Sequence, residues 1–379
     1  MNFFKTIFKY TRSRVWFIVS VSVIVFFVVV GLLAEFVFFT VIGNVLGARP
    51  VENFGGNYYV SDYEDKDDAF EKSNLINEQI AEEGFTLLKN ESNALPLAEG
   101  ARVSVFGKNS VNLAYGGSGS GAFTVTDETP TLYDSLKDAG FVINPTMREF
   151  YDSSASGAGR ASSPTMDNSR STIPGFSTGE TPISSYTDAV KSSYDEYSDA
   201  AIVVFTRIGG ESFDLPRTMH DGNGNKVDGA MDANDHYLEL DENEQDMLIE
   251  ACNNFEKVIV IINSSTTMEL GFLDSADDHD TTLKEGMNGI SSKIDACLWI
   301  GGPGYSGINA LGRILKGSVN PSGKTIDTYQ RDFTKDPTYQ NFSDYLVNNG
   351  NAYMLSDSSV SVSKVEHYID YEEIGRAHV

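Results

Sequence analysis

The chain has 379 residues, of which 41% are hydrophobic and 22% are charged, so it is long enough for one large or two ordinary domains with an apolar core. Its net charge of −26 at pH 7 argues against nucleic acids and anionic lipid headgroups as partners, because both bind basic surfaces. The two cysteines, Cys252 and Cys297, fall in apolar surroundings in different predicted elements, which favours buried free thiols over a disulfide.

The run from Val15 to Leu33 is almost wholly apolar and is long enough for a helix that crosses a bilayer. Basic residues precede it without any acidic residue, which predicts a cytoplasmic amino terminus and places everything after residue 50 outside the cell. A cleaved signal peptide is the alternative, although its apolar region is usually only about 7–15 residues long. We expect a cytoplasmic tail over 1–14, an uncleaved anchor over 15–42 and a polar linker over 43–69.

Strands and helices alternate along the rest of the chain. Helical spacing or composition predicts helices over 70–83, 132–139, 186–197, 241–255 and 308–315. Apolar runs predict extended segments over 85–90, 103–107, 141–143, 201–205, 257–263 and 294–300. The segment 152–185 is rich in Ser, Gly, Thr and Pro and predicts a long surface loop. The alternation predicts an α/β fold: a mostly parallel sheet flanked by helices on both faces, preceded by one transmembrane helix.

The loop that leaves the strand 201–205 is the first candidate functional site. Two glycines allow a sharp turn, and they place Glu211 and Asp214 just past the carboxyl end of this strand. Ligands of open α/β sheets bind at that edge, so a carboxylate there, with Arg207 nearby, is a candidate acid or base. The alternative is a carboxylate that caps a turn or helix, and the local pattern alone favours this alternative.

Three other motifs carry weaker signals. The glycines of 116–121 do not have the spacing of a dinucleotide-binding loop, so they indicate only a backbone that can approach a ligand closely. Gly317–Thr325 misses the phosphate-loop spacing by one residue, which favours a β-turn. The segment Asp221–Asp232 has oxygen ligands in calcium-loop positions, but Lys226 replaces the required glycine, which favours an ordinary turn. The histidines follow no metal-ligand spacing and predict solvated loop residues, and we expect neither metal nor cofactor.

Several segments, taken together, resemble the α/β-sandwich domain of glycoside hydrolase family 3. The segment 81–90, followed by Leu95-Pro96-Leu97, resembles the beginning of that domain, and the glycine-rich loop 116–121 follows in the family's order. Gly302–Gly307 and Asn320–Lys324 resemble its most specific closing motifs. The resemblance covers about 70–345. It departs from the family's pattern at Thr325-Ile326-Asp327-Thr328, which replaces the commoner leucine-proline-x-threonine, and at 217–238, which looks like an insertion.

This resemblance implies an active site shared between two domains. In the family a barrel supplies an aspartate nucleophile and the sandwich domain supplies the acid/base, whose matching position here is Glu211. Gly119, Ser120, Arg207 and Asp214 are the implied substrate contacts, and the implied substrate is a β-linked oligosaccharide or glycoside. Retaining hydrolysis needs two carboxyl groups about 5–5.5 Å apart. The acid must stay protonated near neutral pH, so a partly buried site is expected.

A (β/α)₈ barrel needs about 250 residues, and too little chain lies before 70 or after 345 to supply one. An anchor ahead of the sandwich domain fits the inverted order in which the barrel follows. We therefore expect 346–373 to begin the connector to a missing barrel and 374–379 to be a sequencing artefact. The expected full-length protein is a membrane-anchored, extracytoplasmic β-glycosidase, and the fragment alone is expected to be inactive. The alternative is a free-standing carbohydrate-binding or scaffolding domain on the cell surface.

Overall fold

The computed structural model describes residues 10–36, 62–117, 119–160, 177–209, 235–274 and 283–336, with short pieces at 219, 226, 229–231, 354–356 and 359–361. The chain divides into two units, Met1–Glu64 and Asp65–Val379. The first unit contains helix α2 (Thr11–Phe36). Its segment Thr11–Ala34 is long and apolar enough to cross a membrane, a property that a membrane anchor and a signal sequence share. Residues 37–42 of the expected anchor lie outside the described residues.

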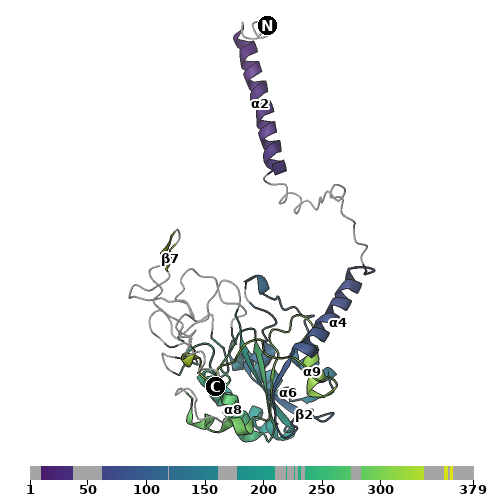
Figure 1. The fold of residues 1–379 in the computed structure, drawn as a ribbon, viewed down its shortest axis with the longest axis vertical. Coiled ribbons are helices and arrows are strands. Elements are labelled where there is room, and N and C mark those ends of the chain that lie inside the picture. The colour runs from purple at the N-terminus through teal and green to yellow at the C-terminus, as the bar shows by residue number, and fades with distance from the viewer. Residues whose placement is uncertain are drawn as a thin grey trace. The chain divides into compact units, whose positions relative to one another are not determined.

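The second unit is built on a six-stranded sheet of order β1-β6-β5-β4-β2-β3 (Figure 1). The strands are β1 (Thr86–Asn90), β2 (Arg102–Phe106), β3 (Val142–Ile143), β4 (Ala200–Arg207), β5 (Val258–Ser264) and β6 (Ala296–Trp299). Only β1 runs antiparallel to its neighbour in this sheet. The predicted α/β fold with a mostly parallel sheet is confirmed. A separate antiparallel pair is formed by β7 (Met354–Ser356) and β8 (Ser359–Ser361).

Helices cover both faces of the sheet, and Figure 1 shows α8 and α9 on opposite sides of it. One apolar core joins the sheet to α4, α5 and α9, and the other joins it to α6, α7 and α8. These helices are α4 (Lys66–Gly84), α5 (Leu132–Asp138), α6 (Pro145–Asp152), α7 (Asp188–Ser192), α8 (Glu242–Asn254) and α9 (Asn309–Leu315). Short 3₁₀ turns are η1 (Lys108–Val111), η2 (Gly119–Gly121), η3 (Ser154–Ser156), η5 (Ile183–Ser185), η6 (Ser193–Glu196), η7 (Gly271–Leu273), η8 (Glu285–Met287), η9 (Ile290–Lys293) and η10 (Phe333–Lys335).

The two central strands show why the sheet forms where the sequence predicts it. Every residue of β4 and β5 is buried, as expected for strands covered on both faces, and this explains their unbroken apolar runs. Asp241 caps the beginning of helix α8: its side chain accepts a hydrogen bond from Glu244 N, while the Glu244 side chain accepts one from Asp241 N. Such a capping box satisfies backbone donors that the first helical turn leaves open. It therefore fixes the point at which the chain leaves the loop before α8.

The structure corrects two expectations about polar segments. Thr178, Glu180 and Thr181, in the predicted surface loop, are buried, and the Glu180 carboxylate accepts hydrogen bonds from the backbone N–H groups of Lys108 and Thr181. His236, expected in a solvated loop, is also buried. Glu180 has its partner Lys108 far away in the sequence, and His236 faces Glu269 at 3.0 Å from another segment, so local composition gives no sign of burial. Both cysteines are free and buried, as predicted.

Candidate active site

The chain reverses its direction of travel across the sheet between β2 and β4. After β2 it continues outward to β3, then returns to add β4, β5 and β6 on the other side of β2. In open α/β sheets such a reversal opens a crevice outside the carboxyl ends of the two strands, and ligands bind there. The loops that leave β2 and β4 are the glycine-rich loop and the loop that carries Glu211. Topology therefore selects the same edge that the sequence patterns select.

The turn after β2 lies directly against β4. Gly107 has a φ of 110°, and a Cβ atom there would stand 2.8 Å from the carbonyl oxygen of Val204. Only glycine combines this backbone conformation with so close an approach. Further along the same loop, Tyr115 O accepts a hydrogen bond of 2.9 Å from Gly304 N in the loop that follows β6. The loops after β2 and β6 are thus packed together at the carboxyl edge of the sheet.

Asn263 joins three of these segments through a single buried side chain. Its Oδ1 accepts hydrogen bonds from Ala114 N at 2.7 Å and from the Thr206 hydroxyl at 3.1 Å. Its Nδ2 donates to Ala114 O at 2.9 Å and to Gly301 O at 2.7 Å. The amide is therefore fully used, and it ties the loops after β2 and β6 to the ends of β4 and β5. Sequence reasoning missed this residue, whose only signal is an amide at the end of an apolar strand.

Arg207 is buried and engages the chain with its whole guanidinium group. The group forms a two-pronged ion pair with Glu244, at 2.7 and 2.6 Å, and also donates to the backbone oxygens of Thr206, Tyr237 and Glu239. These contacts occupy all five N–H donors that an arginine has. The structure therefore gives Arg207 a different task from the expected substrate contact: it fixes the loop before α8 onto the end of β4.

A group of buried carboxyls lies around this ion pair. Burial, with smaller contributions from the charges of Glu244 and Asp241, raises the pKa of Glu180 to about 8, against the effect of its two backbone donors. Burial and the charge of Glu244 also raise the pKa of Asp241 to about 7. The Thr178 hydroxyl donates to Asp241. The interior next to the candidate edge therefore raises the pKa values of two carboxyl groups into the neutral range, a feature that sequence reasoning did not find.

Of the remaining predicted site residues, the structure describes two and leaves two outside the described ranges. Ser120 lies in η2 and is exposed, and Gly119 begins the same turn. The predicted site residues Glu211 and Asp214 lie outside the described residues, and so does most of the candidate calcium loop Asp221–Asp232. The described part of the loop after β4 reaches Gly209, and Ile208 N donates to the Tyr237 hydroxyl at 2.9 Å. The proposed acid/base thus follows a rigidly held strand end.

Such an edge can perform polar chemistry on a ligand that reaches it from outside the sheet. The glycine-rich loop that follows β2 carries the exposed hydroxyl of Ser120, and the loop that follows β4 has two carboxylates in its sequence. Hydroxyls and carboxylates at a strand edge suit a ligand rich in hydroxyl groups, such as a sugar. Neither the geometry nor the topology alone selects one reaction.

Comparison with known proteins identifies the lineage. Residues 85–371 match the family described as the glycosyl hydrolase family 3 C-terminal domain. The chain is 29% identical over 277 residues to β-glucosidase A of Butyrivibrio fibrisolvens, covering 70% of this chain and 29% of that protein. It is 26% identical over 270 residues to a β-glucosidase of Ruminococcus albus, covering 70% of this chain and 24% of that protein. The chain thus spans less than a third of the length of these relatives.

Solved structures show the same fold. β-glucosidase 3B from Thermotoga neapolitana, in complex with glucose, superposes with a TM-score of 0.51 at 21% identity, covering 72% of this chain and 33% of that one. A β-glucosidase from Paenibacillus barengoltzii gives a TM-score of 0.50 at 23% identity, covering 70% and 25%. The family match covers the sheet, the helices α5 to α9 and both loops of the candidate edge, and it begins directly after α4. The chain belongs to glycosyl hydrolase family 3, through the domain described as the C-terminal domain of that family.

Proposed function

We propose that the full-length protein is a retaining β-glycosidase that acts on β-glucosides, in which Glu211 is the general acid/base. The observation that carries the proposal is the end of β4 at the reversal point of the sheet, beside the glycine-rich loop, in a chain related to β-glucosidases. Glu211 follows Arg207 by only four residues, so its Cα lies within about 14 Å of the strand end. The rigid hold on Arg207 therefore limits where Glu211 can be.

The chemistry requires two carboxyl groups with different protonation states. The nucleophile attacks the anomeric carbon as a carboxylate, while the acid protonates the leaving oxygen and then activates water as a base. We assign the second role to Glu211 and supporting sugar contacts to Asp214, Ser120 and Gly119. We assign Arg207 a positioning role instead of the predicted substrate contact, because its N–H donors are occupied by partners within the chain.

The nucleophile belongs, in this proposal, to a barrel domain encoded outside residues 1–379. The relatives that match are more than three times as long as their matched segment, which leaves room for such a domain. The apolar helix α2 serves as an uncleaved membrane anchor and places the catalytic unit outside the cell. The alternative, a domain that binds carbohydrate without hydrolysing it, is separated from the enzyme by the following experiment.

The test compares residues 1–379 with a protein extended by the downstream coding sequence, each assayed on aryl β-glucosides. We expect turnover only from the extended protein. Glu211→Gln in that protein should lower kcat on substrates with poor leaving groups by about 10²–10⁴-fold, the usual contribution of general acid–base catalysis. Azide should restore turnover with an activated leaving group and yield a glycosyl azide, because this small anion replaces water without needing a base.

Glu149→Gln is the matched control, because Glu149 is an exposed carboxylate on α6. It should leave kcat unchanged. Turnover by residues 1–379 alone would contradict the shared active site, and an unchanged kcat in Glu211→Gln would remove Glu211 from the role. Sugar binding by residues 1–379, with no turnover from any extended protein, would favour the non-catalytic alternative.

A further inference from the structure

We propose that His236, Glu239 and Glu269 bind a single Zn²⁺ ion, at a site separate from the glycosidase chemistry proposed above. The three ligand atoms lie within 4.8 Å of one another, and all three residues are buried. They come from two segments, the loop before α8 and the loop after β5, and Glu269 follows Glu239 by 30 residues. This separation explains why no metal-ligand spacing is visible in the sequence.

The distances within the cluster suit a small ion. Nε2 of His236 lies 3.0 Å from Oε1 of Glu269. Two ligands bound to one zinc at about 2.0–2.2 Å in tetrahedral geometry stand about 3.3 Å apart, so this pair is close to coordination spacing already. The Glu239 carboxylate must approach by rotation of its side chain. Its Oε1 accepts a hydrogen bond of 2.7 Å from His236 N, which keeps the carboxylate beside the imidazole.

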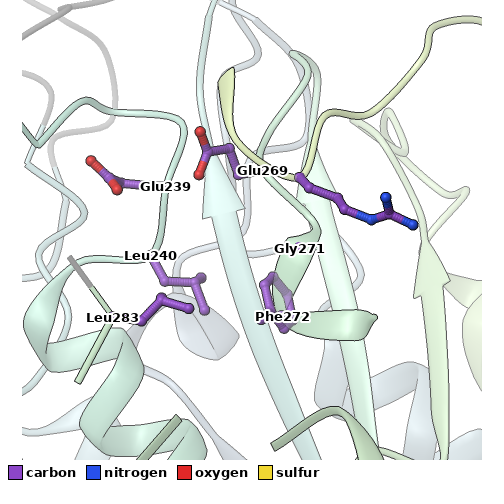
Figure 2. Close-up of a pocket in the computed structure, with 7 residues that line it drawn as sticks. Glu239, Leu240, Glu269, Gly271, Phe272 and Leu283 are labelled. Carbon is purple, nitrogen blue, oxygen red and sulfur yellow. The ribbon is translucent and has the colours of Figure 1, made fainter. Parts of the chain in front are cut away.

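A small cavity adjoins the cluster. Glu239 and Glu269 both line it, and Figure 2 shows the two carboxylates on the same side of this pocket, above Leu240 and Phe272. Its volume of about 20 Å³ is room for one water molecule. Three protein ligands with a fourth position for water are the arrangement of open zinc sites. The cavity thus supplies the place for the fourth ligand.

The donor set selects the metal. One imidazole nitrogen and two carboxylate oxygens match zinc, which binds His, Asp and Glu with four ligands. Calcium and magnesium take six or more oxygen ligands and do not favour nitrogen. The residues His236, Glu239 and Glu269 are 2%, 7% and 6% exposed. So dry a site favours a partly dehydrated ion held by few ligands over a strongly hydrated Mg²⁺.

Binding requires a change of imidazole tautomer. Without metal, Nδ1 of His236 accepts a 3.3 Å contact from Leu238 N, so the proton is on Nε2, facing Glu269. Coordination through Nε2 moves this proton to Nδ1 and replaces the contact to Glu269 by bonds from both groups to zinc. The contact to Leu238 N, at 3.3 Å, is longer than a good hydrogen bond, and the ring must turn so that the new Nδ1–H finds an acceptor in place of this donor.

A bound ion would join three segments at the rim of the candidate active site. Glu269 Oε1 also accepts from Phe333 N, and Arg207 holds the backbone of Tyr237 and Glu239. After short described pieces at 219, 226 and 229–231, the chain that leaves β4 with Glu211 is continuously described again from Asp235, directly before His236. Zinc would therefore fasten the end of that loop to the loop after β5. We expect this to stabilise the domain whether or not Glu211 is catalytic.

The direct test is titration of the untagged full chain, in detergent and stripped of metal by a chelator, with ZnCl₂ in a calorimeter. We expect one ion per chain with a Kd below about 1 μM near pH 7.5, within the range of protein zinc sites. Zinc at 100 times its Kd should raise Tm by about 5 °C. Calcium and magnesium, titrated in the same way, should bind far more weakly. Glycosidase turnover plays no part in this readout, so the proposal stands or fails independently of the proposed function.

Variants locate the site. His236→Gln and Glu269→Gln should each weaken zinc binding at least tenfold, whereas the exposed control Glu149→Gln should leave the Kd unchanged. Because either core variant can fail to fold, zinc-soaked crystals of the unsubstituted chain give a second measurement. They should show an anomalous difference peak within about 2.5 Å of the three ligand atoms. No saturable binding below 100 μM zinc, a peak elsewhere, or tighter binding of calcium than of zinc would overturn the proposal.

Discussion

Glu180 makes the stability of the domain depend on pH in an unusual direction. Its carboxylate is buried, and its pKa is raised from 4.5 to about 8, first by burial and then by nearby Glu244 and Asp241. Between these two pH values the folded chain holds a proton that the unfolded chain has lost. Stability therefore falls as pH rises from about 4.5 to about 8, and it levels off outside this window. The more common salt-bridged carboxylate gives the opposite slope.

The size of the effect follows from the same two values. A difference of about 3.5 pH units, at about 1.36 kcal/mol for each, corresponds to about 5 kcal/mol at alkaline pH. Glu180→Gln removes the titration and keeps an amide oxygen to accept from Lys108 N and Thr181 N, at a cost of about 1 kcal/mol for the lost second acceptor. The variant should be slightly less stable at pH 5 and several kcal/mol more stable at pH 9.

Urea unfolding of the full chain in detergent, from pH 5 to pH 9, measures this crossover. The fluorescence of Trp299 reports unfolding, because its indole donates to Ser264 O inside the sheet. Glu149→Gln controls for the general self-repulsion of a chain with a net charge of −26, which also grows with pH. Parallel pH profiles for the wild type and Glu180→Gln would refute the reasoning, since they would show that Glu180 titrates alike in the folded and unfolded chains.

Three further predictions concern the strand ends and the amino terminus. Arg207→Lys should lower stability by about 3–5 kcal/mol, as measured by thermal unfolding, because Lys cannot form the two-pronged pair with Glu244. An unchanged Tm together with a raised KM for substrate would instead support the original prediction that Arg207 contacts the substrate. Asn263→Asp should lower stability by about 2–5 kcal/mol, because it sets a carboxylate oxygen against the carbonyls of Ala114 and Gly301. The control is Asn253→Asp, at an exposed asparagine that accepts a hydrogen bond from Lys293, and it should cost under about 0.5 kcal/mol in the same assay. Mass spectrometry of the mature protein should find residues 1–36 retained in the membrane fraction, and a start near residue 49 would contradict the anchor.

Most of the sheet could be predicted from the sequence because each strand carries its own signal. The apolar runs of β4 and β5 are unbroken, since both strands are covered on both faces. The acidic beginning of α8 reflects a local capping box, so it is also visible in sequence. The helix predicted over 186–197 is less regular in the structure, where α7 passes into the 3₁₀ turn η6. Leu75, Ile76 and Ile80 of α4 are exposed, so helical spacing identified that helix but not what its apolar residues contact.

The polar interior could not be predicted, because its contacts join residues far apart in the chain. Asn263 bonds Ala114 across 149 positions, and Glu180 bonds Lys108 across 72. No window of local sequence contains both partners of either contact. The segment that holds Glu180 has the composition of a surface loop, and only the backbone donors of Lys108 and Thr181 make its burial tolerable. Local composition therefore fails most often at buried polar side chains, which fix the loops of a site.

The candidate edge could still be located, because the strands are predictable from the sequence even where the polar contacts at their ends are not. The residues that fix it come at, or directly after, the ends of the most predictable strands: Phe106 precedes Gly107, Arg207 ends β4, and Asn263 is the last but one residue of β5. In a parallel sheet those ends meet at one edge, so strand prediction alone gathers residues whose contacts it cannot see. What it cannot supply is the task of each residue. Arg207 looked like a ligand contact from its position, and only its five acceptors show that it holds the loop on which the proposed acid/base depends.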